Sequence, residues 1–205
     1  MEIVLQFFPS LALCALAGVR LFGVFFLLGL LARLDGLGLV AVPPQLAMLG
    51  HLVVLFPLGL LAMLELFVDK LSWVDTLWDG CFTLPRPLGG MALGALLAWP
   101  AGGSMIGVCA VLGGLLALAA HAGKAGARIH LRDSGHMAST PVVSLAEDLF
   151  VIAAAFAFLQ HRLLALALSG GVLMLALLMV KDVAQTLVGC RQRLVGRVPL
   201  PRGPA

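Results

Sequence analysis

Residues 88–123 read LGGMALGALLAWPAGGSMIGVCAVLGGLLALAAHAG and contain no Asp, Glu, Lys or Arg. A helix that crosses a bilayer needs about 20 predominantly apolar residues, so this stretch is too long for one crossing. Pro100-Ala101-Gly102-Gly103 interrupts it and predicts a turn. We therefore expect a helical hairpin within a membrane, with helices over Leu88–Trp99 and Ser104–Ala122.

The whole chain shares this apolar character. Of its 205 residues, 61% are hydrophobic and 11% are charged, and the mean hydropathy is +1.10, whereas about a quarter of a soluble domain is charged. The sequence predicts an all-α, polytopic transmembrane bundle that forms one domain over residues 1–183. The basic residues 184–205 are expected to form a disordered cytoplasmic tail. No basic region precedes the first apolar run, so we expect a retained span and not a signal peptide.

Charge clusters and Pro/Gly turns separate four further apolar helices. They are expected over Phe8–Leu31, Gln45–Val68 with a kink at Pro57, Pro141–Phe158 and Leu163–Val180. The polar stretches Asp69–Pro87 and Gly123–Thr140 are expected to lie between helices. Helix 88–99 is short, roughly 18 Å. It either crosses the membrane, starting as early as Thr76–Phe82, or is re-entrant.

The basic residues favour six spans. With six, one face carries Lys70, Arg86, Lys124, Arg128, Arg132 and the basic residues after position 180, and the other carries Arg33 and Arg162. Positive charge collects on the cytoplasmic side, so both termini are expected there, in a cell inner membrane. Leu58–Lys70 also aligns with Leu112–Lys124 without a gap. A weak parallel repeat and chance similarity between leucine-rich helices both stay open.

Ionisable side chains inside spans are costly and are therefore candidates for function. Arg20 sits in the middle of the first apolar segment, and we expect it to face the bundle interior and meet a carboxylate. Glu65 and Asp69 are four residues apart and share a helix face. The adjacent Glu147 and Asp148 point about 100° apart on a helix, so one of them is expected to face a given partner. The candidate ion- or substrate-binding residues are Arg20, Glu65, Asp69, Lys70, Lys124, Arg128, Glu147 and Asp148.

Two interpretations of these charges stay open. They line a polar cavity that binds an ion, a proton or an anionic headgroup, or they are ion pairs that hold the helices in register. Asp75 and Asp79 are expected at the membrane interface. His121, His130 and His136 lack the spacing of a helical metal pair, and the four cysteines form no CxxC pair, so we expect no metal and no cofactor.

Several segments resemble the bacterial membrane-protein family known as domain of unknown function 4126, over about residues 10 to 180. The first is the Gly-x-Arg opening in Leu16–Phe22. The others are Glu65–Lys70 with Val74-Asp75, Thr83–Pro87, His121–Arg128, and the Pro-Val-Val-Ser-x-x-Glu-Asp motif in Thr140–Asp148. Arg132–Met137 replaces a glycine-rich link of the family. The resemblance implies an integral membrane protein and supplies no activity.

The leading functional hypothesis is a small transporter or channel-like protein for an ion or small polar solute. The alternative is a non-catalytic membrane scaffold or lipid-binding protein. A membrane enzyme acting on a lipid headgroup is a weaker third hypothesis, because no HExxH, GxSxG or kinase signature is present. The expected partners are membrane lipids and an ion or small solute, with a homo-oligomer as an option and no nucleic acid.

Overall fold

The computed structural model describes residues 2–38, 41–71, 74–133 and 140–160, with Leu164, Ala167 and Met174 described singly. Most of the predicted helix Leu163–Val180 and the whole tail after it lie outside the described residues. Every regular element within them is a helix, which confirms the all-α class. In chain order the elements are α1 (Glu2–Val19), α2 (Leu21–Asp35), the 3-10 helix η1 (Pro44–Gly50), α3 (Leu52–Val68), α4 (Val74–Cys81), α5 (Pro85–Ala98), the 3-10 helix η2 (Trp99–Ala101), α6 (Gly103–Asp133) and α7 (Thr140–Gln160).

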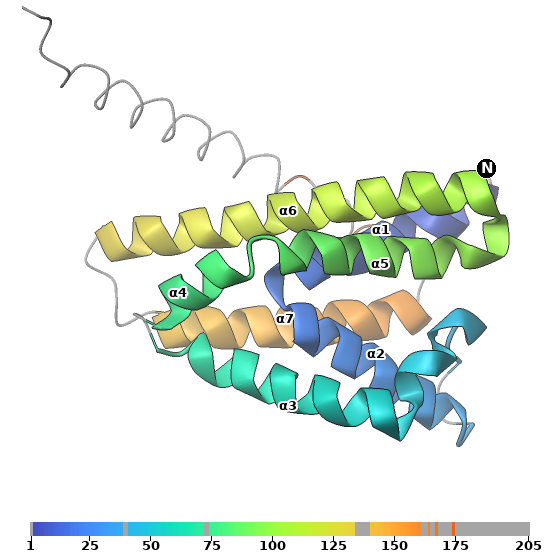
Figure 1. Cartoon of the computed structure of the whole chain (residues 1–205), viewed down its shortest axis with the longest axis horizontal. Coiled ribbons are helices and arrows are strands. Elements are labelled where there is room, and N and C mark those ends of the chain that lie inside the picture. Colours follow the sequence, from blue (N-terminus) through green and yellow to red (C-terminus); the bar gives the residue numbers. More distant parts are fainter. Residues whose placement is uncertain are drawn as a thin grey trace, which may run out of the picture.

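The helices form a bundle with two parts that share the first apolar segment (Figure 1). α5 and α6 pack along each other as a hairpin, and α1 packs against both of them. α2 leaves this group and packs against α3, η1 and α7. The first apolar segment therefore changes neighbours between α1 and α2. The junction of these two helices lies between the two parts of the bundle.

The hairpin predicted from residues 88–123 is confirmed. Its turn is η2 followed by Gly102, whose φ of 91° lies in the left-handed region that favours glycine. α5 and α6 approach so closely that a Cβ on Gly94 would lie 2.2 Å from the backbone oxygen of Cys109. On the other side, a Cβ on Gly18 of α1 would lie 2.0 Å from the oxygen of Ala117. Small residues let membrane helices pack at such short distances.

The first predicted helix, Phe8–Leu31, is wrong as a single element. α1 ends at Val19, α2 begins at Leu21, and Arg20 between them has φ −139° and ψ 83°. The sequence gives no Pro at this point, so apolar continuity predicted an unbroken helix. The physical reason for the break lies in side chains from other helices, described with the site below.

Two other boundaries also differ from the prediction. The second apolar segment bends by 73° between η1 and α3, at His51, while α3 continues through Pro57. α6 does not end at Ala122 but continues to Asp133, so the first part of the predicted polar connection is helical. Lys124 and Arg128, four residues apart on this extension, are buried, and their interior partners explain why the helix continues. α7 matches its predicted range closely.

Helices long and apolar enough to cross a membrane are present among the described residues. Gly103–Arg128 and Val142–Leu159 meet this condition by length and composition, and the bent pair η1 and α3 adds a third if it counts as one span. Large apolar side chains are exposed along α3, α6 and α7, where lipid can cover them. Within the part of the chain that the structure describes, the protein is thus helical with two or three candidate spans.

The close approach of α1 to α6 leads to a test. We predict that Gly18→Ala lowers the free energy of unfolding by about 1–3 kcal/mol, because the new methyl group overpacks the contact with Ala117. Gly107→Ala is the matched control, since a Cβ there meets nothing within 4 Å, and it should change stability by less than about 1 kcal/mol. Unfolding of the purified protein in detergent measures both. Equal effects of the two substitutions would contradict the packing described here.

Candidate functional site

A carboxylate from α3 holds the broken end of the first apolar segment. The first N–H groups of any helix have no partner within that helix. At the start of α2, Glu65 accepts them: Leu21 N–H donates to Oε1 at 3.1 Å, and the N–H groups of Phe22 and Gly23 donate to Oε2 at 3.0 and 3.2 Å. A negative charge there is also stabilised by the positive end of the helix dipole. Glu65 is buried, so this cap replaces the missing helix bonds inside the protein.

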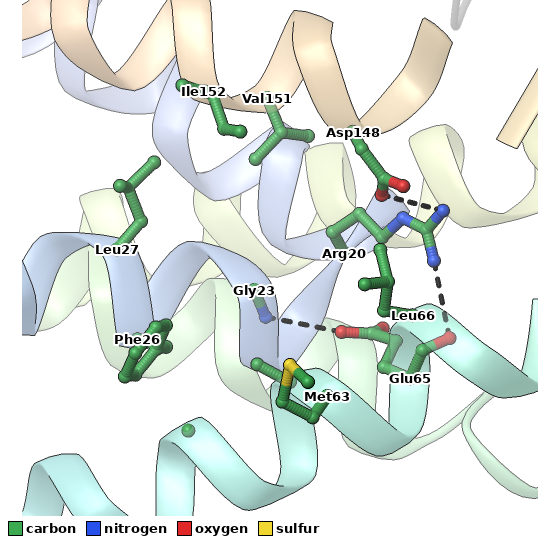
Figure 2. A pocket seen from close by; sticks show the side chains of 12 residues that line it. Arg20, Gly23, Phe26, Leu27, Met63, Glu65, Leu66, Asp148, Val151 and Ile152 are labelled. Atoms are coloured by element: carbon green, nitrogen blue, oxygen red, sulfur yellow. Dashed lines mark hydrogen bonds and ion pairs between the residues drawn. The ribbon is translucent and has the colours of Figure 1, made fainter. Parts of the chain in front are cut away.

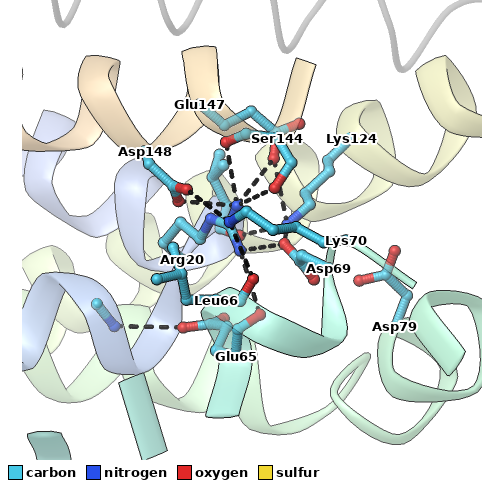
Figure 3. Close-up of polar contacts among 12 residues, drawn as sticks. Arg20, Glu65, Leu66, Asp69, Lys70, Asp79, Lys124, Ser144, Glu147 and Asp148 are labelled. Atoms are coloured by element: carbon cyan, nitrogen blue, oxygen red, sulfur yellow. Dashed lines mark hydrogen bonds and ion pairs between the residues drawn. The ribbon is translucent and has the colours of Figure 1, made fainter. Parts of the chain in front are cut away.

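Arg20 projects from the break into a set of acceptors on α3 and α7 (Figure 3). Its side chain forms an ion pair with Asp69 and another with Asp148 at 2.8 Å. It also donates to Ser144 Oγ at 2.8 Å and lies 3.9 Å from Glu147. Arg20 is only 3% exposed, so the expectation that it faces the interior and meets a carboxylate is confirmed. The expectation that one of Glu147 and Asp148 faces a given partner is wrong, because the guanidinium reaches both.

Asp69, which directly follows α3, is shared by three cations. Its Oδ2 accepts from Arg20, from Lys124 Nζ at 2.6 Å and from Arg128 Nη2 at 3.1 Å. Burial alone raises the pKa of the Asp69 carboxyl, but Lys124, Arg128 and Arg20 outweigh it and hold this pKa at about 2. Lys124 also donates to the oxygen of Val19 at 2.9 Å, the last residue of α1. Asp69 therefore connects α3, α6 and the break.

A second group of polar side chains lies between α4, α5 and α6. Arg86 is fully buried, and its Nη1 donates to Asp79 Oδ1 at 2.7 Å and to His121 Nδ1 at 2.6 Å. A guanidinium only donates hydrogen bonds, so Nδ1 of His121 is the acceptor and the ring proton is assigned to Nε2. Nε2 then donates to Thr83 Oγ1, 3.3 Å away. The Thr83 hydroxyl in turn donates to the backbone oxygen of Asp79 at 2.9 Å. The contacts fix one tautomer of a neutral imidazole.

Two ion pairs join the second group to the first. Arg128 Nη1 lies 3.3 Å from Asp79, and Arg86 Nη2 lies 3.6 Å from Glu65. Within the described residues the joined network contains five carboxylates and five cations, Glu65, Asp69, Asp79, Glu147 and Asp148 with Arg20, Lys70, Arg86, Lys124 and Arg128. A balanced network avoids the large cost of an unpaired buried charge. We call these ten residues the charge network.

All eight residues singled out from the sequence belong to the charge network. That they bind a ligand stays a prediction. Lys70 is its most exposed member, 3.7 Å from Asp148. The network also includes Arg86, which was expected in a cytoplasmic connection, and Asp79, which was expected at the membrane interface. Both side chains are buried within the protein, and their depth in a membrane stays a prediction. Asp79 lies on α4 and Arg86 lies on α5, with a turn between them, so no helical spacing in the sequence signalled their contact. The side chain of Asp75 lies outside the described residues.

A cavity of about 230 Å³ lies beside the network, between α2, α3 and α7 (Figure 2). Its charged lining residues are Arg20, Glu65 and Asp148, and its remaining walls are apolar side chains and glycines. Among the residues that the structure describes, no group of three or more His, Cys, Asp or Glu side chains is arranged to hold a metal ion.

A family model described as Domain of unknown function (DUF4126) matches residues 8–182. The chain belongs to this family. Every residue of the charge network falls within the matched range, so the network is part of the family domain. No curated protein and no solved structure matches the chain. Membership of this family brings no activity with it, and the function has to be argued from the geometry.

The sharing of Asp69 by three cations leads to the next test. We predict that Asp69→Asn lowers the free energy of unfolding by about 3–5 kcal/mol, because it leaves buried cations without their common carboxylate. The control is Asp35→Asn, an exposed carboxylate at the end of α2, which should change stability by no more than about 0.5 kcal/mol. Unfolding in detergent is the measurement. A loss below about 1 kcal/mol for Asp69→Asn would show that the network is not shared as described.

The Glu65 cap predicts a difference between two replacements. Glu65→Gln keeps an oxygen that accepts backbone N–H groups. Glu65→Leu leaves these groups unpaired, which costs about 1–3 kcal/mol of stability for each group. Hydrogen exchange at Leu21, Phe22 and Gly23 should therefore speed up much more in Glu65→Leu than in Glu65→Gln. Similar exchange in both variants would mean that Glu65 acts through its charge and not as a cap.

Proposed function

We propose that the protein carries an ion or a small polar solute across the membrane, and that the charge network is where this solute is recognised. The observation that carries the proposal is the helix break at Arg20. The first N–H groups of α2, which follow the break, donate to Glu65. Discontinuous helices with their ends at charged groups form the substrate sites of many transporters. An apolar segment that only anchors the chain has no need of such a break.

Exchange of partners gives this site a mechanism. In this structure Arg20 is paired with Asp69 and Asp148, so a solute cation competes for a carboxylate and a solute anion competes for the guanidinium. Replacing one partner by another avoids leaving a lone charge in a low-dielectric interior. The network therefore accepts a charged or polar solute at a lower cost than a bundle without such pairs.

The proposal includes a cytoplasmic side in a cell with an inner membrane. α3 and α6 end, and α7 begins, at the same end of the bundle (left in Figure 1). α1 runs toward this end beside α6 and α2 runs back from it beside α3, so α1 begins at the opposite end (Figure 1). This course does not fit one span over both helices with the N-terminus in the cytoplasm. Lys70 and the basic end of α6 lie at that end, in agreement with the positive-inside rule.

A second candidate is a membrane scaffold or lipid-binding protein. The specific observation that favours it is the pairing of all ten network charges with one another, beside a cavity whose walls are mostly apolar. In this candidate the ion pairs fix the register of the helices and carry nothing. Solute flux separates it from transport.

The test compares two double variants in liposomes that contain purified protein. Arg20→Gln with Asp148→Asn removes one cation and one carboxylate together, so the charge of the network stays balanced. Arg33→Gln with Asp35→Asn is the matched control, since both side chains are exposed near the end of α2. We expect the wild-type protein and the control to move at least one member of a panel of ions and small solutes, and the first variant to lose this flux.

Two outcomes would count against transport. One is the absence of wild-type flux above empty liposomes across the whole panel. The other is full flux in a folded Arg20→Gln, Asp148→Asn variant. Either result, with folding confirmed by the unfolding midpoint, supports the scaffold.

A further inference from the structure

The cavity beside the network is a cleft between α3 and α7 with its floor on α2. Phe26 and Leu27 come from α2, Met63 comes from α3, and Val151 and Ile152 come from α7 (Figure 2). Its volume of about 230 Å³ is below the roughly 300–1,000 Å³ of pockets that enclose a whole small molecule. A ligand larger than the cleft would therefore place only part of itself inside and leave the remainder outside.

The mouth of the cleft leads to the apolar surface. Met63 is 54% exposed and Ile152 is 53% exposed, on two helices that carry further exposed apolar side chains. In a membrane this surface faces lipid. A hydrocarbon chain enters such a cleft directly from the bilayer, but it gains little by doing so because lipid tails are as apolar as the walls. Affinity and specificity must therefore come from the polar end.

The polar end carries a donor and an acceptor that make no hydrogen bond. Arg20 Nε and Asp148 Oδ2 are buried atoms without a hydrogen-bond partner, although the two residues form an ion pair with each other at 2.8 Å and Oδ2 lies 3.7 Å from Lys70 Nζ. Leaving such atoms unpaired costs about 1–3 kcal/mol each. A ligand head that has both an acceptor and a donor satisfies both once the two side chains turn toward the cleft. Because Arg20 and Asp148 neutralise each other, a head without net charge fits this end better than an anion does.

We propose that the cleft between α3 and α7 binds one membrane lipid whose head carries no net charge. The head lies at the Arg20–Asp148 ion pair, and the adjoining part of an acyl chain lies against Phe26, Met63 and Ile152. This site goes beyond the proposed transport and does not rest on it.

Gly23 provides a way to block the polar end. It lines the cleft, and the one heavy atom that its Cβ would meet within 4 Å is the Arg20 Cβ, at 3.4 Å. A Cβ at this position therefore meets no backbone of another helix, and the rest of a leucine side chain takes up space at the wall of the cleft. Gly107→Leu is the matched control, because it adds the same side chain to an exposed helical glycine with nothing within 4 Å. Ile152→Trp narrows the cleft at its half-exposed mouth.

The experiment is native mass spectrometry of the full-length protein released from detergent, with phosphatidylethanolamine, diacylglycerol or phosphatidylglycerol added. We expect one molecule of a lipid without net charge, phosphatidylethanolamine or diacylglycerol, to stay bound to the wild type and to Gly107→Leu. Occupancy should fall about tenfold or more in Gly23→Leu and in Ile152→Trp. If Gly23→Leu does not fold, Ile152→Trp decides the result.

Two results would overturn the lipid site. The first is unchanged occupancy in the folded cleft variants. The second is that the occupancy lost in those variants belongs to the anionic phosphatidylglycerol as much as to the other two lipids. Mass spectrometry detects the bound lipid without any measurement of flux. If the protein holds the lipid but moves no solute, the transport proposal fails and the lipid site stands.

Discussion

The carboxylate of Asp69 accepts from Arg20, Lys124 and Arg128 at one oxygen, and the rest of the bundle depends on this shared contact. It fixes the end of α3 against α6 and against the break between α1 and α2. With Arg20 held there, Glu65 lies where it accepts the first N–H groups of α2, and Ser144 and Asp148 bring α7 to the same guanidinium. Three cations on one buried carboxylate are tolerable because four further carboxylates balance the remaining charges.

The sequence identified the members of this network more reliably than the shape of the backbone that carries them. Charges are rare in apolar segments and costly there, so Arg20, Glu65, Asp69 and Asp148 stood out by composition alone. The break at Arg20 could not be predicted in the same way, because its cause is Glu65, which is 45 residues away in the chain. The helical extension of α6 was missed for a related reason: Lys124 and Arg128 make the segment polar, as in a loop, yet both point to carboxylates inside the protein.

The charge network and the cleft lie side by side in the bundle and differ in chemistry. The network offers paired charges, and the cleft offers mostly apolar walls that end at one of the network's own ion pairs. A lipid held in the cleft lies against Arg20, the residue at the helix break, so its binding and any movement of α2 relative to α3 are linked through that side chain. Family membership covers both regions.

The central claim is that Arg20 and Asp69 act as one buried pair that holds the break in place, and a double-mutant cycle tests it most directly. The free energies of unfolding of the wild type, Arg20→Gln, Asp69→Asn and the double variant are measured in the same detergent. The account predicts a coupling energy of about 2–3 kcal/mol, at the upper end of the range for residues in contact. Effects of the two substitutions that add to within about 0.5 kcal/mol, as for distant sites, would contradict it.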